Sequence, residues 1–213
     1  MQKTSSILGT SLKNEMISHK HKCIFIHIPR CGGTSMEIAM SGKDWWRVER
    51  STKHLIASTA KKIYEPYWND YFKFSFVRNP WDRMVSLGRF SKFYGVNLGD
   101  HSINLSKYFK KFPHIEIDPR SKSKHDKFDP IKNSVFLNIL NVELDFIGRF
   151  ENINEDFEFV YESIGEVPTL LTNRRRERSS HKHYTEYYNE ETKQIVAKKF
   201  AKDIDYFGYE FGR

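Results

Sequence analysis

Two stretches of the sequence indicate the fold most directly, Phe25–Ser35, which reads FIHIPRCGGTS, and Phe76–Ser86, which reads FVRNPWDRMVS. Each begins with apolar, aromatic and β-branched residues, which indicate a buried strand. Each then passes through a turn into a segment that favours a helix, and in the second stretch Asn79 and Pro80 supply an N-cap and a first helical position. Two strand–turn–helix units in one chain are typical of an α/β fold.

The rest of the chain continues this alternation of strands and helices. Strands are expected over residues 22–29, 71–77 and 144–150, and helices over 34–40, 51–64, 80–94, 105–112, 153–164 and 189–200. Asn152 and Asn189 are the expected N-caps of the last two helices. The order predicts an α/β, three-layer sandwich around a central, mostly parallel sheet. We expect a flexible basic lead-in over residues 1–22 and a single domain over 23–213, with a polar loop insertion around 113–134.

Composition limits the classes of partner and of cellular compartment. The chain has 213 residues, enough for one domain with a sizeable core, and its net charge of +8 favours anionic partners such as nucleotides, sulfated sugars, nucleic acids or membrane surfaces. Two cysteines do not make a disulfide framework. Residues 1–22 lack the apolar core of a secretory signal, and no apolar run reaches the roughly 20 residues that span a bilayer. A cytoplasmic location is therefore expected.

The first stretch carries groups that suit an anion. A strand that turns through Gly32 and Gly33 into a helix presents main-chain N–H groups at the helix N-terminus, while Arg30, Thr34 and Ser35 add side-chain donors. A nucleotide-binding Walker motif would require Lys directly before the hydroxyl residue, and none is present here. The loop therefore suits an anion held without a metal ion, although a purely structural turn would have the same pattern.

The second stretch has a comparable arrangement. Arg78 follows a buried strand at the end where ligands bind in open α/β sheets, and Ser86 lies about two turns into the next helix. The two side chains are placed to converge on one phosphate. The alternative is that Arg78 forms an ion pair with Asp82 at the start of the helix.

Taken together, the two stretches resemble the motifs of the sulfotransferases that use 3′-phosphoadenosine-5′-phosphosulfate (PAPS), in particular the carbohydrate sulfotransferase-like, Sulfotransfer_2-like branch. The segments Asp145–Asn152 and Asp203–Tyr209 also look like that branch. The resemblance implies a fold similar to the P-loop nucleotide kinases, with a first loop that grips the 5′-phosphosulfate and a second motif that grips the 3′-phosphate. The implied donor-binding residues are Arg30, Cys31, Gly32, Gly33, Thr34, Ser35, Arg78 and Ser86.

Two residues of the first loop need separate consideration. The family usually has Lys where this chain has Arg30, and Arg keeps the charge but does not readily give up a proton to a leaving group. Cys31 has two interpretations. A thiol near a helix N-terminus can have a lowered pKa, but we favour a small residue that fills the turn.

The resemblance also implies a general base for an acceptor hydroxyl. His54 lies between the two motifs, in the segment where similar carbohydrate sulfotransferases place a catalytic His, and it is the candidate base beside Arg30 as the second catalytic residue. The alternative is an ordinary surface histidine. His27 is expected to pack in the core or to support the loop. Glu37, one turn into the first helix, is within reach of the site, but we favour a solvated helix face for it.

The leading hypothesis is a sulfuryl transfer from PAPS to a hydroxyl of a carbohydrate, glycolipid or other acceptor. It implies no metal, no nucleic-acid partner and no membrane span. The alternatives are a P-loop-like nucleotide kinase or NTPase, and a non-catalytic protein that binds anions or nucleic acid. The basic run at 174–178 is either a lid over an anionic group or a solvated loop.

Overall fold

The computed structural model describes residues 16–42, 54–90, 133–168, 171 and 182–213. Its sheet has the strand order β1 (Ile17–Ser18), β2 (Cys23–Ile26), β3 (Phe72–Val77) and β4 (Phe146–Arg149). β2, β3 and β4 are parallel neighbours, and β1 pairs with β2 in the antiparallel sense. The predicted mostly parallel sheet is therefore confirmed.

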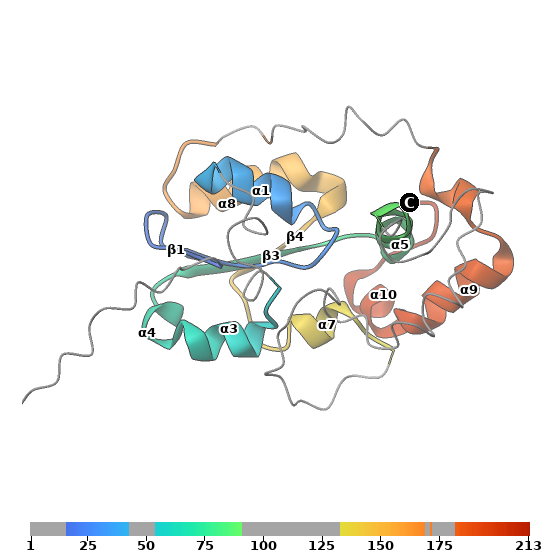
Figure 1. Ribbon diagram of the computed structural model, residues 1–213, viewed down its shortest axis with the longest axis horizontal. Helices are drawn as coiled ribbons and strands as arrows, with labels where there is room; N and C mark the ends of the chain where they lie inside the picture. The colour runs from blue at the N-terminus through green and yellow to red at the C-terminus, as the bar shows by residue number, and fades with distance from the viewer. Residues whose placement is uncertain (1–15, 43–53, 91–132, 169–170, 172–181) are drawn as a thin grey trace, which may run out of the picture.

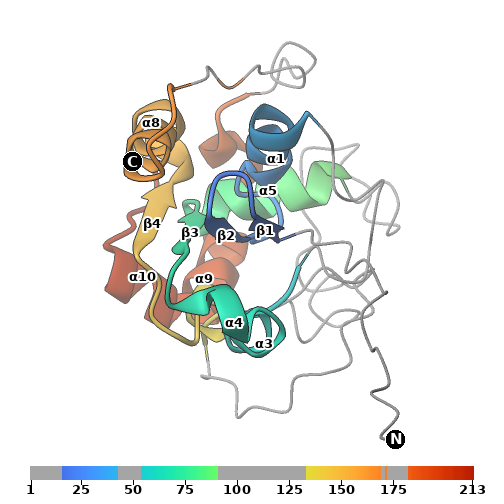
Figure 2. The ribbon, with the colours of Figure 1, turned by 90° about the vertical axis from the view of Figure 1, so that its left-hand side faces the viewer.

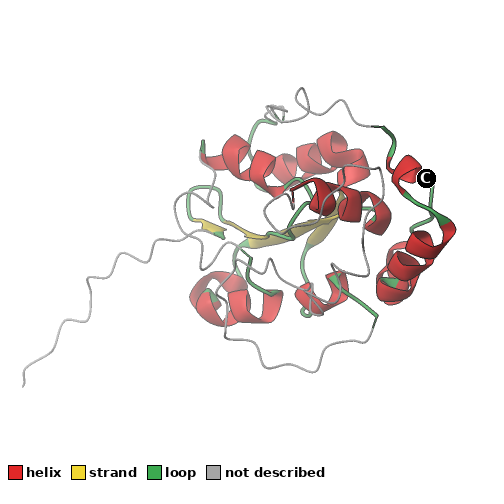
Figure 3. Ribbon diagram, turned by 45° about the vertical axis from the view of Figure 1, so that its right-hand side comes forward, coloured by secondary structure: helices red, strands yellow, loops and turns green. Residues whose placement is uncertain are grey.

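Helices cover both faces of this sheet. α1 (Gly33–Ser41) and α8 (Ile153–Ser163) lie on one face, and α3 (Ala57–Ile63), α4 (Glu65–Trp68) and α7 (Phe136–Ile139) lie on the other (Figure 1). Figure 2 shows the same layers along the strands, and Figure 3 shows strands enclosed between helices. The predicted three-layer α/β sandwich is confirmed.

The remaining helices gather beyond the carboxyl ends of the strands. These are α5 (Pro80–Phe90), α9 (Glu190–Lys199) and α10 (Ala201–Phe207), and α5 packs against α9 (Figure 1). The expected final helix over 189–200 is thus followed directly by a second helix, because the chain turns at Phe200 and is helical again from Ala201 to Phe207.

The core is built from the aromatic and β-branched residues of the strands. Phe25 is paired with Phe74 across β2 and β3, their rings stack at 4.9 Å, and Phe74 is in turn paired with Phe146 on β4. All four residues of β2 are buried, as expected for a parallel strand covered on both faces.

Several element boundaries test the sequence-based expectations. The Asn79 side chain accepts from the main-chain N–H of Trp81 at 3.1 Å, and Asn189 forms a capping box with Thr192, so both predicted caps are confirmed. Asn152 occupies the N-cap position of α8 without a capping bond, because a short 3₁₀ turn (η2, Phe150–Asn152) precedes the helix. The expected helix over 51–64 is helical only from Ala57 among its described residues.

The strand β1 was not expected, since it lies within the range assigned to the basic lead-in. The expected helix over 105–112, the part of the helix over 80–94 beyond Phe90, and the basic run at 174–178 lie outside the described residues, as does nearly all of the loop around 113–134. Among the described residues, no helix combines the length and the apolar character that a membrane span needs.

Candidate functional site

The two sequence motifs meet at the carboxyl edge of the sheet. β2 leads through residues 27–32 into α1, and its parallel neighbour β3 leads into α5. The Arg30 Nε donates to Ser86 Oγ at 3.0 Å, which joins one side chain of each motif. Arg78 Nη1 donates to the Arg30 carbonyl at 3.1 Å. Residues predicted to bind opposite ends of one ligand are thus within reach of one another.

The main chain of the first loop has the geometry of an anion site. Arg30 has a φ of 70° and Gly32 a φ of 86°, both in the left-handed region. Gly32 is the N-cap of α1, and no side chain caps this end of the helix. A helix N-terminus without a side-chain cap directs N–H groups and the positive end of the helix dipole toward a ligand. The first turn of α1, which contains Gly33, Thr34 and Ser35, therefore begins with a main chain that suits an anion.

Gly33 is required for a steric reason. A Cβ at this position would lie closer than 3.0 Å to three atoms of the His27 imidazole ring. The ring is itself fixed, because His27 stacks on Phe25 at 5.4 Å and its Nδ1 bonds Glu37 Oε1 at 2.5 Å. Only glycine allows the start of α1 to approach His27 this closely.

Arg78 makes the ion pair that was considered as the alternative interpretation. Its Nε and Nη2 each lie 2.7 Å from Asp82 Oδ2, and its guanidinium stands 3.9 Å over the Phe150 ring. The pair does not use all of the guanidinium, since Nη1 faces the Arg30 carbonyl. Asp82 therefore orients Arg78 toward the first loop, and the ion pair and an anion site are compatible.

The Cys31 side chain fills the interior of the turn. It is 1% exposed, and burial raises the pKa of its thiol to about 11 even though the nearby charges of Arg83 and Arg78 act in the opposite direction. The Cys31 N–H donates to the Ile28 carbonyl at 3.4 Å. The favoured interpretation of a turn-filling residue fits, and that of a low-pKa thiol is wrong.

His54 is 5% exposed, which contradicts the alternative of an ordinary surface histidine. Its Nδ1 lies 3.0 Å from the His27 carbonyl oxygen. Because a carbonyl only accepts, Nδ1 must carry the proton, and in the neutral ring Nε2 is then the basic nitrogen. The rings of His54 and His27 meet edge to face at 4.6 Å. The main chain at the end of β2 thus selects the tautomer that a general base needs.

The sequence interpretation was wrong about Glu37, which is 3% exposed rather than on a solvated face. α1 lays this side chain over β2, where it bonds His27, and sequence spacing on the helix carries no signal of that partner. Arg83, which lies three residues before Ser86 on the same side of the helix, was not predicted as a site residue. Its Nε donates to the Pro29 carbonyl at 2.9 Å, and the available signal was its position between Arg78 and Ser86 in the second motif.

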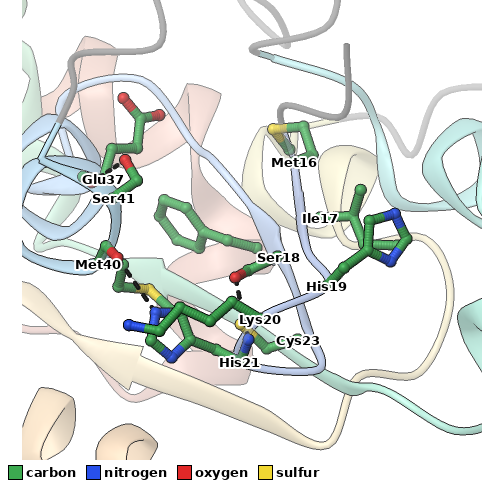
Figure 4. A pocket seen from close by; sticks show the side chains of 11 residues that line it. Met16, Ile17, Ser18, His19, Lys20, His21, Cys23, Glu37, Met40 and Ser41 are labelled. Carbon is green, nitrogen blue, oxygen red and sulfur yellow. Dashed lines mark hydrogen bonds between the residues drawn. The ribbon is translucent and has the colours of Figure 1, made fainter. Parts of the chain in front are cut away.

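A cavity of about 310 Å³ lies between the β1–β2 hairpin and α1 (Figure 4). It is lined by residues of the hairpin together with Phe25, Glu37, Met40 and Ser41. Glu37 lines this cavity and also bonds His27, but none of the predicted donor-binding residues lines it. The candidate site is therefore placed at the carboxyl edge of the sheet, where Arg30, Arg78 and Ser86 meet. Among the described residues, no cluster of His, Cys, Asp and Glu suits a metal ion.

The chain matches the model of the sulfotransferase family, Sulfotransfer_2, over residues 13–210. It is similar to human carbohydrate sulfotransferase 9, with 24% identity over 221 aligned positions that cover 88% of this chain and 47% of the human protein. The chain thus spans about half the length of that relative. An uncharacterized protein of Archaeoglobus fulgidus is 30% identical over 104 positions, which cover 49% of this chain and 76% of the archaeal protein. No solved structure matches the chain.

The match includes both motifs and almost the whole length of the chain. It agrees with the parallel sheet and with the two loops that meet at its carboxyl edge. The chain belongs to the sulfotransferase family, in its Sulfotransfer_2, carbohydrate sulfotransferase-like branch.

Proposed function

We propose that this sulfotransferase transfers a sulfuryl group from PAPS to a hydroxyl of a carbohydrate or glycolipid. The observation that carries the proposal is the contact of Arg30 with Ser86 at 3.0 Å, because it brings the two phosphate-binding motifs to a single place at the ends of β2 and β3. A small donor with anionic groups at both ends suits such a pair of loops.

The residues present fit this donor. The start of α1, which no side chain caps, and the Arg30 guanidinium would hold the 5′-phosphosulfate, with the hydroxyls of Thr34 and Ser35 beside them. Arg78 and Ser86 would hold the 3′-phosphate. Cys31 would take part only through its main chain, since its side chain is buried. When bound, PAPS supplies a sulfuryl group on a good leaving phosphate.

His54 and Arg30 have the catalytic roles in this proposal. His54 Nε2 takes the proton of the acceptor hydroxyl, which is the task that its fixed tautomer permits. Arg30 would hold its positive charge near the oxygen of the leaving phosphate and would keep its own proton. The His27 carbonyl, at the end of β2, orients the imidazole of His54.

A carbohydrate acceptor is supported by the similarity to a protein named as a carbohydrate sulfotransferase. The predicted cytoplasmic location stays a prediction. A nucleotide kinase is disfavoured because Gly33, and not the Walker lysine, precedes Thr34.

Calorimetry with adenosine 3′,5′-bisphosphate, compared with ATP and Mg²⁺, tests the donor. We expect binding of the bisphosphate in the absence of metal, whereas a preference for ATP with Mg²⁺ would refute the proposal. A screen that follows labelled sulfate from PAPS onto panels of glycans and lipids then tests the acceptor class. Binding of many polyanions that weakens steeply with salt, without turnover, would indicate a non-catalytic anion binder instead.

A further inference from the structure

Arg83 is a buried cation directly beneath the first loop. It lies on α5, is 1% exposed, and its Nε donates to the carbonyl of Pro29 at 2.9 Å. Arg78, from the start of the same motif, donates to the next carbonyl, that of Arg30. Two arginines of the second motif therefore hold two successive carbonyls of the first loop.

We propose that Arg83 is a positioning residue that fixes the donor-binding conformation of the loop Pro29–Gly32. In this arrangement the second motif shapes the first loop in addition to binding the other end of the donor. That this loop binds the donor rests on the proposed function. The contact of Arg83 with the loop is seen in the structure and is independent of that function.

The first argument comes from peptide geometry. A trans peptide is planar, so a Pro29 carbonyl drawn toward Arg83 turns the N–H of Arg30 to the opposite side, away from α5. Arg30 also has a positive φ, a conformation that residues other than glycine keep only where the surroundings hold them. The bond from Arg83 is one of the contacts that hold it.

The second argument comes from charge. Within the described part of the chain Arg83 has no carboxylate partner, and its Nη1 is buried without a hydrogen-bond partner. Among the described residues this buried charge faces the Pro29 carbonyl and the Phe136 ring, whose centroid lies 5.6 Å from the guanidinium carbon, and not a carboxylate. The charge of Arg83 lies next to Cys31, inside the loop, where it adds to the attraction for an anion.

The chain supplies its own reporter for the loop. Its cysteines are Cys23 on β2 and Cys31 in the loop, both free and each 1% exposed. A loop that loses its anchor should expose Cys31 to a thiol reagent and leave Cys23 protected. Loss of the whole fold should expose both thiols.

The variant Arg83→Lys keeps the charge but loses the planar fork that reaches Pro29. We expect alkylation of Cys31 by iodoacetamide, followed by peptide mass spectrometry, to become about tenfold faster, with Cys23 unchanged, and the affinity for adenosine 3′,5′-bisphosphate to fall about tenfold. Arg149→Lys is the matched control. Arg149 also donates to a main-chain carbonyl near this edge of the sheet, that of Phe207, and should change neither readout.

Unchanged Cys31 alkylation together with unchanged affinity in Arg83→Lys would overturn the proposal. Equal acceleration at both cysteines would also overturn it, because Arg83 would then only stabilise the fold. If the wild-type protein fails to bind the bisphosphate while Arg83→Lys still exposes Cys31 selectively, the donor assignment fails and the anchoring of the loop by Arg83 stands.

Discussion

Gly33 lies so close to the His27 imidazole ring that no side chain fits at position 33. We expect Gly33→Ala to lower the free energy of unfolding by about 1–3 kcal/mol, because the new methyl group overlaps the fixed imidazole ring. Urea unfolding measures this change. In combination with His27→Ala, which removes the obstacle, the added cost of Gly33→Ala should largely disappear.

Gly42 is the matched control for that pair. It has a φ of 72°, and a Cβ there would meet nothing within 4 Å, so Gly42→Ala carries only backbone strain of about 1 kcal/mol. The losses in the free energy of unfolding from Gly42→Ala and from His27→Ala should therefore add in the double variant. If the cost of Gly33→Ala also simply added to that of His27→Ala, as expected for Gly42→Ala, the His27 ring would not be the reason for the glycine at the start of α1.

In the proposed mechanism, His54 is the general base for the acceptor hydroxyl. We expect His54→Ala to lower kcat by about 10²–10⁴-fold, since a positioned general base contributes that much. The affinity for adenosine 3′,5′-bisphosphate should not change, because the residues assigned to the donor are intact. Sulfate transfer to an identified acceptor, with calorimetry alongside, measures both.

His19→Ala is the control, because His19 is an exposed histidine on the β1–β2 hairpin that bonds Tyr71. The His19→Ala variant should transfer sulfate as fast as the wild type. Full activity in His54→Ala would remove the base assignment and leave the donor assignment in place.

At the scale of elements, Asp203 of α10 holds the start of α7. Its side chain is 0% exposed and accepts from Ser134 Oγ at 2.7 Å, from Val135 N at 2.6 Å and from Leu137 N at 3.1 Å. Asp203→Ala leaves these donors buried without their acceptor, so we expect a loss of about 3 kcal/mol in the free energy of unfolding.

Thermal unfolding measures the loss as a decrease in Tm of roughly 2–4 °C per kcal/mol for a chain of this size. The control is Asp205→Ala, an exposed carboxylate on the same helix, which should leave Tm nearly unchanged. Equal shifts for the two variants would contradict the role of Asp203 as a cap supplied by a distant element.

Local patterns were sufficient to predict most of the elements. β2, β3 and the caps at Asn79 and Asn189 follow from residue types within a few positions of each other, and they are where the sequence places them. β1 has two residues, too few for periodicity to reveal. The helix predicted over 189–200 corresponds to α9, whereas α10, which follows directly after the turn at Phe200, was not predicted.

The candidate site divides in the same way. Arg30, Gly32, Arg78 and Ser86 were predicted from their positions in the two motifs, and the structure brings Arg30, Arg78 and Ser86 into contact. The bond from Glu37 to His27 depends on how α1 lies over β2, and no local pattern encodes that contact. Tertiary packing determines which buried polar side chains become hydrogen-bond partners in such cases.

At the scale of the whole molecule, buried acids make stability depend on pH in alkaline solution. Burial raises the pKa of Cys23 from about 9 to about 12 and that of Cys31 to about 11. Burial also raises the pKa of the hydroxyls of Tyr184, Tyr188 and Tyr209. In the unfolded chain the thiols lose their protons near pH 9, whereas the folded protein retains them.

Above about pH 9 the unfolded state therefore binds fewer protons than the folded state, and the free energy of unfolding falls as pH rises, by up to about 1.4 kcal/mol per pH unit for each thiol. The contribution of Cys31 stops growing once the folded protein also ionises, at about pH 11. Urea unfolding at pH 8, 9 and 10 measures the slope. We expect a variant with both Cys23→Ala and Cys31→Ala to be less stable at every pH. Its free energy of unfolding should nevertheless fall less steeply between pH 9 and 10. The fall that remains is due to the tyrosines. An identical slope in the two proteins would mean that the thiols ionise alike in both states, which their burial in β2 and in the first loop does not allow.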